Sequence, residues 1–439
     1  MKKRLVALLL CLSMVLVMAA CGGTEVKDPE TDAPETGTEE TVAPETEAEV
    51  ETVEIKGTIK VGHLLDLTGV EQVVGELASK AFTFASAYVT AQTGWEFEVV
   101  EGDCQSDADK AQVSAENMIN QGCKVIFGPT QIGHKKSVLG YVADNPCPVV
   151  LYNGSPAAFT GGFLFGNDYI VALGGGTAGF PSVMADYLYK EVGLRKVYCF
   201  KQDGAGGNNY VDPFKTCFEA LGGEVIDNVA VPQPTNDWSA YLAAMINSDA
   251  EAIVGWTSSS DTLAFYKEWY NSGAYEKLPV YATMHGGFTD TMVLEQLDGK
   301  IVDEVIKHGT CAPICYSYNN DNEYNKAYVE AWEAEFGEVP LGNNLPGSIC
   351  QALLCLANAL DAVGPEASPQ ELADAMRAAE FDGPEGHTKF EEGSVVAVKD
   401  VYVVNVVKLG DSYNYEVAKV YEQIPPIGYN LDKDGNYIG

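Results

Sequence analysis

Residues 125–155 read VIFGPTQIGHKKSVLGYVADNPCPVVLYNGS, and their pattern decides the fold class. A short apolar run, Val125–Phe127, stops at a Gly-Pro pair, and a second apolar run, Pro148–Leu151, stops at Asn153-Gly154-Ser155. Between them, residues 133–143 have helical spacing, which predicts a βαβ unit with two parallel strands. Ligands bind beyond the carboxyl ends of strands in an open parallel sheet. We therefore expect the two loops to form one wall of a ligand-binding cleft.

The alternation of apolar runs and helical stretches continues on both sides of this unit. Upstream, Thr58–Leu65 and Glu96–Val100 are predicted strands, each followed by a helix, and Asp107 is predicted to cap the second helix. A short strand is predicted at Phe163–Phe165, and the pattern restarts after Gly174. Such alternation indicates doubly wound parallel sheets. Because the chain is too long for one typical core, we predict an α/β fold with two such lobes.

The first 20 residues have the features of a secretory signal peptide. A basic start is followed by an apolar run and by small residues just before Cys21. This sequence resembles the lipobox of bacterial lipoproteins, which implies that Cys21 carries lipid and becomes the mature N-terminus. The implied location is extracytoplasmic, with the chain lipid-anchored to the bacterial cell membrane. An uncleaved membrane anchor is the alternative.

Residues 21–55 differ in composition from the rest of the chain. Between Thr24 and Glu54 there are 12 acidic residues, one lysine and almost no large apolar side chains. Such a segment buries too little apolar surface to offset its ordering entropy. We therefore expect a disordered acidic tether between the lipid anchor and the folded lobes. A binding tail for a basic partner is the alternative.

Charge and cysteine content limit the possible partners. A formal net charge of −36 argues against nucleic acid, whose binding needs basic patches. Nine of the 11 cysteines remain after the loss of Cys11 and the lipidation of Cys21, so at least one stays unpaired. Cys311 and Cys315 are the best candidate pair. We predict no metal site and no cofactor, because there is no Cys-x-x-Cys and no cluster of histidines.

Several short segments carry a resemblance to a known family. They are IKVG and LTG (59–62 and 67–69), GD and SD (102–103 and 106–107), VIFGP (125–129), ALGGEV (220–225), DWS (237–239), FGEVP (336–340) and FDGPEG (381–386). In this order they resemble the type I periplasmic binding-protein family, in its Leu/Ile/Val-type branch. The resemblance implies two lobes that close around a small-molecule ligand and deliver it to an ABC permease. It further implies a monomer without enzymatic activity.

The resemblance also implies where the lobes begin and end. Lobe 1 is expected at residues 56–170 and 308–392, and lobe 2 at residues 171–307 and 393–439. Three chain crossings near residues 167–180, 303–310 and 390–400 are expected to form the hinge.

The first-lobe part of the family's ligand site maps onto the two loops of the opening stretch. Gln131 and Ile132 follow the Gly-Pro pair, and Asn153, Gly154 and Ser155 follow the next strand. Backbone N–H groups and a hydroxyl at a helix N-terminus suit a carboxylate. A helix cap or a turn is the structural alternative for Ser155.

The second-lobe part departs from the family pattern. Trp256 and Thr257 supply an aromatic and a hydroxyl group, and His285 stands where the family has the acid that pairs with an ammonium group. An imidazole does not pair with an ammonium ion as a carboxylate does. We therefore expect a small carboxylate or amide with an apolar part rather than a simple aliphatic amino acid, unless Asp261 or Asp290 compensates. The structural alternatives are a core ring for Trp256 and a solvated loop for His285.

Other classes of protein fit the sequence less well. The glycine-rich run at 174–179 has no nucleotide-binding context, and an extracellular hydrolase would need a nucleophile and a base that we do not find. A sensory ligand-binding domain without transport uses the same fold. It remains the main alternative to a solute-binding protein.

Overall fold

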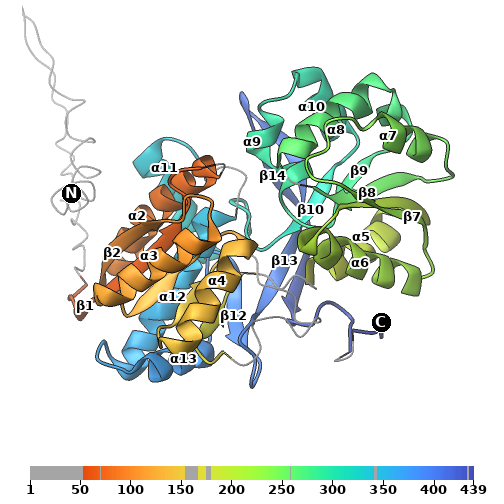
Figure 1. The fold of residues 1–439 in the computed structure, drawn as a ribbon. Coiled ribbons are helices and arrows are strands. Elements are labelled where there is room, and N and C mark those ends of the chain that lie inside the picture. The colour runs from red at the N-terminus through yellow and green to blue at the C-terminus, as the bar shows by residue number, and fades with distance from the viewer. Residues whose placement is uncertain are drawn as a thin grey trace, which may run out of the picture. The chain divides into compact units, whose positions relative to one another are not determined.

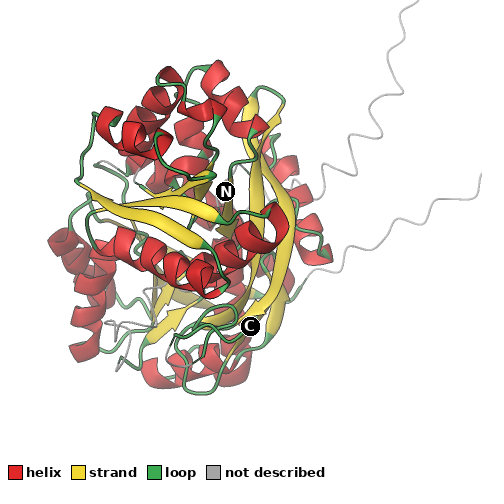
Figure 2. Ribbon diagram, turned by 90° about the vertical axis from the view of Figure 1, so that its right-hand side faces the viewer, coloured by secondary structure: helices red, strands yellow, loops and turns green. Residues whose placement is uncertain are grey.

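The computed structural model describes residues 53–69, 71–153, 167–174, 179–257, 259–340, 344–432 and 435–439. Residues 55–439 form one compact unit (Figures 1 and 2). The expectations for the signal peptide, Cys21 and nearly all of the tether lie outside the described residues. The same is true of Gly154, Ser155 and the strand predicted at 163–165.

The first lobe is built on a five-stranded parallel sheet with the order β2-β1-β3-β4-β5. Its strands are β1 (Gly57–Leu65), β2 (Trp95–Asp103), β3 (Val125–Phe127), β4 (Val149–Leu151) and β5 (Ile170–Ala172). Its helices are α2 (Gln72–Thr93), α3 (Ala108–Asn120), α4 (Ile132–Asp144), α11 (Glu323–Phe336), α12 (Leu345–Val363) and α13 (Pro369–Ala378).

Helices cover both faces of this sheet. On one face, α2, α12 and α13 form a core with alternate strand residues such as Val61 and Phe127. On the other face, α3 and α4 pack on Leu64 and Ile126. Because successive strand residues point to opposite faces, the apolar runs of the strands supply both cores. The doubly wound arrangement predicted from the sequence is confirmed.

The second lobe repeats the construction with the strand order β7-β6-β8-β9, again parallel. Its strands are β6 (Lys196–Gln202), β7 (Glu224–Val231), β8 (Ala252–Trp256) and β9 (Val280–Ala282). Its helices are α5 (Gly179–Tyr187, followed by a π-helical turn at Leu188–Val192), α6 (Ala205–Ala220), α7 (Ser239–Ile246), α8 (Ser259–Asn271), α9 (Thr291–Leu294) and α10 (Gly299–Lys307). These helices also divide between two core clusters, one on each face.

A third, antiparallel set of strands links the lobes. It contains β10 (Cys311–Ile314), β11 (Phe381–Gly383), β12 (Gly386–Phe390), β13 (Ala397–Leu409) and β14 (Ser412–Ile424). The long strand β13 begins beside β5, through the pairing of Val396 with Ala172, and contributes Ala397 to the first core. Further along, Tyr402 and Val404 belong to the second core.

The core clusters bear on the proposed hinge crossings. Residues of α10 and β10, including Val305, Ala312 and Ile314, lie in the second core. The three hinge crossings expected near residues 167–180, 303–310 and 390–400 stay predictions.

The structure decides whether the cysteines pair. All nine cysteines of the described residues are free and buried, so the Cys311–Cys315 pair is wrong. Cys311 begins β10 and Cys315 follows its last residue. Because a strand rises about 3.3 Å per residue, the two cysteines lie farther apart than a disulfide allows. Helix α12 is long and apolar enough to cross a membrane, but 78% of its apolar window is buried. It is accordingly a core helix of the first lobe.

Candidate ligand-binding site

The loop after β3 brings the N-terminus of α4 to the carboxyl edge of the first sheet. Gly128 has a φ of 90°, and a Cβ there would lie 2.4 Å from the carbonyl oxygen of Leu64. Only glycine fits so close to the neighbouring strand. Gln131 is the extended residue before α4 and makes no side-chain capping bond. The first turn of a helix has N–H groups without intrahelical acceptors, so this end of α4, which starts at Ile132, suits an anion.

Asn153 lies at the end of the neighbouring strand and is held from two sides. The side chain of Asn344 donates a hydrogen bond of 3.3 Å to its Oδ1. The ammonium group of Lys135, in the first turn of α4, donates to its backbone carbonyl. Lys135 is only 1% exposed, and this burial lowers its pKa to about 7. A titratable amine thus joins the two loops that the sequence assigned to the ligand.

Lys135 was missed in the sequence reasoning. It is one of two consecutive lysines, and Lys136 is exposed. The two lysines differ only in the direction in which they leave the helix. Lys135 lies beside the buried His134 on the inner face of α4, whereas Lys136 lies on the outer face. A lysine at a helix N-terminus beside a predicted anion site is the signal that could have found it.

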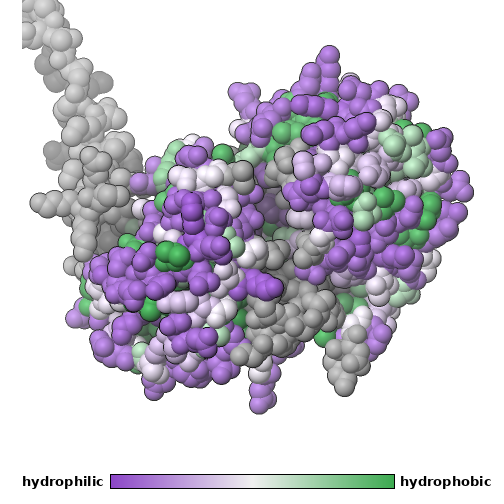
Figure 3. All heavy atoms as spheres, in the orientation of Figure 1, coloured by the Kyte–Doolittle hydropathy of each residue, from purple (hydrophilic) through white to green (hydrophobic). Residues whose placement is uncertain are grey.

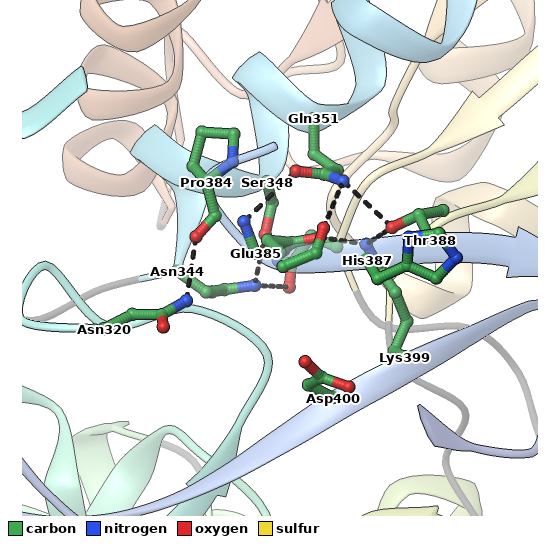
Figure 4. A network of polar contacts seen from close by, with 12 residues as sticks. Asn320, Asn344, Ser348, Gln351, Pro384, Glu385, His387, Thr388, Lys399 and Asp400 are labelled. Carbon is green, nitrogen blue, oxygen red and sulfur yellow. Dashed lines mark hydrogen bonds and ion pairs between the residues drawn. The ribbon is translucent and has the colours of Figure 1, made fainter. Parts of the chain in front are cut away.

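A buried polar network connects this wall with the strands that link the lobes (Figure 4). The side chain of Asn344 lies 3.4 Å from the hydroxyl of Ser348, which donates to Glu385. Glu385 forms a fully buried ion pair with Lys399 of β13. Lys399 also donates to Thr388 of β12 over 2.9 Å. Figure 4 shows these side chains converging around Glu385, which explains how both charges are accommodated in the interior.

The corresponding edge of the second sheet carries aromatic and hydroxyl groups. Trp256 ends β8 and is half-buried, with its ring 5.4 Å from that of Tyr210 in α6. Thr257 is buried, and its hydroxyl has no hydrogen-bond partner among the described residues. A Cβ on Gly287 would lie 2.2 Å from the carbonyl of Thr257, so the loops after β8 and β9 pack closely.

His285 lies in the loop after β9, half-buried. Its backbone N–H donates to Pro313 over 3.2 Å. Its ring stands edge-to-face with that of Tyr415, with centroids 5.8 Å apart. The hydroxyl of Tyr415 in turn donates to Thr289 over 2.7 Å. These contacts hold His285 in place, so it is not a freely solvated loop residue.

The acids proposed to compensate for His285 differ in their surroundings. Asp261 accepts hydrogen bonds from Gln202 and Thr235 and is 2% exposed, which is a structural role. Asp290 is half-buried and caps α9. Burial, together with the charges of Asp66 and Asp290, raises the pKa of Glu71 at the start of α2. Glu71 of the first lobe therefore feels the field of Asp290 in the second, which the sequence did not reveal.

Figure 3 shows the surface hollowed between the lobes. A separate open groove of about 590 Å³ runs between α3 and α4. It is lined by helix side chains such as Gln112 and Tyr141 and leaves out the loop residues after β4, so we assign no ligand to it.

Comparisons with known proteins agree with this architecture. The model of the periplasmic binding-protein family matches residues 58–411. A relative from Brucella suis biovar 1 (strain 1330), the Leu/Ile/Val-binding protein homolog 6, is 22% identical over 335 residues, which are 75% of this chain and 83% of the relative.

Two solved structures share the fold. An ABC transporter substrate-binding protein from Sphaerobacter thermophilus is 23% identical with a TM-score of 0.73, over 84% of this chain and 99% of that chain. A solute-binding protein of an ABC transporter from Rhodopseudomonas palustris BisB5, solved with 3,4-dihydroxy benzoic acid, is 22% identical with a TM-score of 0.71. That match covers 84% of this chain and 98% of the other.

Two parallel-sheet lobes, linked by shared strands, thus define a two-lobed binding protein. The chain belongs to the type I periplasmic binding-protein family.

Proposed function

We propose that this chain is an extracytoplasmic solute-binding lipoprotein of an ABC importer, and that its ligand is a small carboxylate or amide with an apolar or aromatic part. The observation that carries the proposal is the convergence at the first-lobe edge of the α4 N-terminus, Lys135 and Asn153. Helix N–H groups and an ammonium ion together favour a carboxylate.

The second-lobe edge supports the same class of ligand. The half-buried rings of Trp256 and His285 offer surface for an apolar or aromatic body, and His285 is held by its edge-to-face contact with Tyr415. Thr257 offers a hydroxyl. The Rhodopseudomonas palustris relative was solved with an aromatic acid, which is a ligand of this class.

An amino acid is the second candidate ligand, and one observation favours it. Asp290 and Glu71 interact electrostatically, and an ammonium group near both carboxylates would relieve their repulsion. The name of the Brucella suis relative points to the same ligand class.

Titration calorimetry of the purified chain with 3,4-dihydroxybenzoate, benzamide and leucine separates the candidates. We expect the aromatic acid to bind most tightly and leucine least. Bound ligand should also raise the unfolding temperature in the same order. Tight binding of leucine alone would contradict the proposed ligand class and assign Asp290 to the ammonium group.

Membrane attachment is tested separately. In the native host, replacement of Cys21 by alanine should move the protein from the membrane fraction to the soluble fraction. Retention of the Cys21→Ala protein in washed membranes would contradict the lipid anchor. Loss of ligand uptake on deletion of the gene, restored by the wild-type gene, would distinguish import from sensing.

A further inference from the structure

Three potential metal ligands meet at the carboxyl edge of the first sheet, next to the ligand wall. Asp66 follows β1, Cys104 follows β2, and His134 lies in the first turn of α4 after β3. These three strands are neighbours in the order β2-β1-β3. One carboxylate oxygen, the thiol sulfur and one ring nitrogen all lie within 4.8 Å of one another.

The three side chains are buried, and two of them present unsatisfied atoms to the cluster. Asp66 is 1%, Cys104 0% and His134 7% exposed. Asp66 Oδ2 and His134 Nδ1 have no hydrogen-bond partner among the described residues. Burying a polar atom without a partner is unfavourable, because the atom has lost its hydrogen bonds to water. The two unsatisfied atoms lie near the thiol of Cys104, so a bound atom or ion between the three side chains would satisfy both of them.

The spacing of these atoms suits a metal ion better than a hydrogen bond. Asp66 Oδ2 and His134 Nδ1 are 3.8 Å apart, too far for a hydrogen bond. Two nitrogen or oxygen ligands of one tetrahedral zinc ion lie about 3.4 Å apart, given bond lengths near 2.1 Å. A movement of a few tenths of an ångström would bring this pair into coordination distance.

Neighbouring backbone groups hold the first two ligands in place. The other oxygen of Asp66 accepts a hydrogen bond of 2.6 Å from the N–H of Ser106. Ser106 and Gln105 both adopt positive φ values, 51° and 53°, which are uncommon for residues other than glycine. The N–H of Cys104 donates to Leu65 over 2.8 Å. These two hydrogen bonds fix the loops after β1 and β2 to each other, and they hold Asp66 and Cys104 close together at the carboxyl edge of the sheet.

We propose that Asp66, Cys104 and His134 bind one divalent transition-metal ion, with zinc the ion that this mixed oxygen, sulfur and nitrogen set favours. Asp66 Oδ2 and His134 Nδ1 bind through lone pairs, with the ring proton of His134 on Nε2. The Cys104 thiol releases its proton to solvent and binds as a thiolate. The charges of one carboxylate and one thiolate cancel those of the ion, so the buried site is neutral. A water molecule completes the tetrahedron, and the ion ties together the loops after β1, β2 and β3.

Cobalt is a suitable probe because its thiolate complexes absorb in the near ultraviolet, whereas zinc is spectroscopically silent. The full purified chain, freed of metal by a chelator, is titrated with Co²⁺ and then with Zn²⁺. We expect one ion per chain, a thiolate-to-cobalt absorption band, and displacement of cobalt by zinc. Loss of even an outer partner of a metal site costs about 10- to 100-fold in affinity. Cys104→Ser, Asp66→Asn and His134→Gln should therefore each weaken zinc binding at least that much, and Cys104→Ser should abolish the band.

Two control variants test the location of the site. Cys123→Ser alters another buried cysteine of the same core. His387→Gln alters a surface histidine that lies 2.8 Å from Asp382 and 2.9 Å from Glu380. Both controls should bind cobalt as the wild type does. The proposal is overturned if the wild-type chain gives no thiolate band, if the band survives in Cys104→Ser, or if only His387→Gln loses the metal. Asp66→Asn preserves shape, so circular dichroism of this variant separates lost binding from lost folding. No organic ligand enters the experiment, so its outcome is independent of the proposed transport function.

Discussion

The two walls of the proposed cleft are built alike and differ in chemistry. Each lies at the carboxyl edge of a parallel sheet. The wall of the first lobe presents the N-terminus of α4 with the buried amine of Lys135. The wall of the second lobe presents Trp256, the hydroxyl of Thr257 and the ring of His285. We infer that the first wall supplies most of the affinity for an acidic group, and that the second wall selects the rest of the ligand.

Among the variants proposed to test this difference between the walls, Lys135→Met should change carboxylate affinity the most. Removal of a hydrogen bond to a charged partner costs about 1.5–3 kcal/mol, so carboxylate binding should weaken about ten- to a hundredfold in calorimetry. The matched control is Lys136→Met, which alters the adjacent exposed lysine and should bind like the wild type. Equal affinities for both variants would remove Lys135 from the ligand site.

The pH dependence of binding should follow the lowered pKa of Lys135, about 7. A carboxylate prefers the protonated amine, which is the main form below that pKa. Above it, binding must take up a proton, so affinity should fall by up to about tenfold per pH unit. Dissociation constants measured from pH 6 to 8.5 should show this fall for 3,4-dihydroxybenzoate and none for neutral benzamide. The same slope in Lys135→Met would assign it to another group.

The His285→Glu change should alter selectivity more than affinity. A carboxylate at this position adds the countercharge for an ammonium group, so the preference for leucine over the aromatic acid should rise about tenfold. His285→Gln serves as the control, because it is polar and uncharged. A similar gain for leucine in both variants would contradict the electrostatic explanation.

The smallest effect is expected from Thr257→Val. Its hydroxyl is buried without a partner among the described residues, so the change should leave the unfolding temperature almost unchanged. If the hydroxyl bonds to the ligand, affinity should fall about fivefold, the equivalent of about 1 kcal/mol. Thr257→Ser keeps the hydroxyl and should retain full affinity. Weak binding by both variants would point to packing instead of a hydrogen bond.

Local sequence signals predicted the sheets and most helices well. Short apolar runs that end in glycine and polar residues marked β3 and β4. The N-cap at Asp107 is confirmed, because its side chain accepts hydrogen bonds from the N–H groups of Asp109 and Lys110. The strands β13 and β14 extend past their apolar stretches, because their ends pair with each other, as in Lys408 with Tyr413 and Leu409 with Ser412.

The chemistry of the site was harder to predict, because it depends on contacts between distant segments. Asp66, Cys104 and His134 meet only through the order of the parallel strands, and no sequence spacing indicates a metal ligand set. The expectation of no metal site rested on such spacing. Similarly, the interaction of Glu71 with Asp290 depends on how the two lobes approach each other. Gln131 and Ile132 lie where α4 begins, close to the helix start expected after the Gly-Pro pair. Their contact with a ligand stays a prediction, as does that of Gly154 and Ser155, which lie outside the described residues.

The long strand β13 has a consequence for how the protein unfolds. It contributes Ala397 to the first core and Val404 to the second, and it pairs with both β12 and β14. If one lobe melted, the other would lose a strand from its own core. Unfolding of either lobe therefore destabilises the other. We expect residues 55–439 to unfold in one cooperative transition, although they contain two parallel sheets.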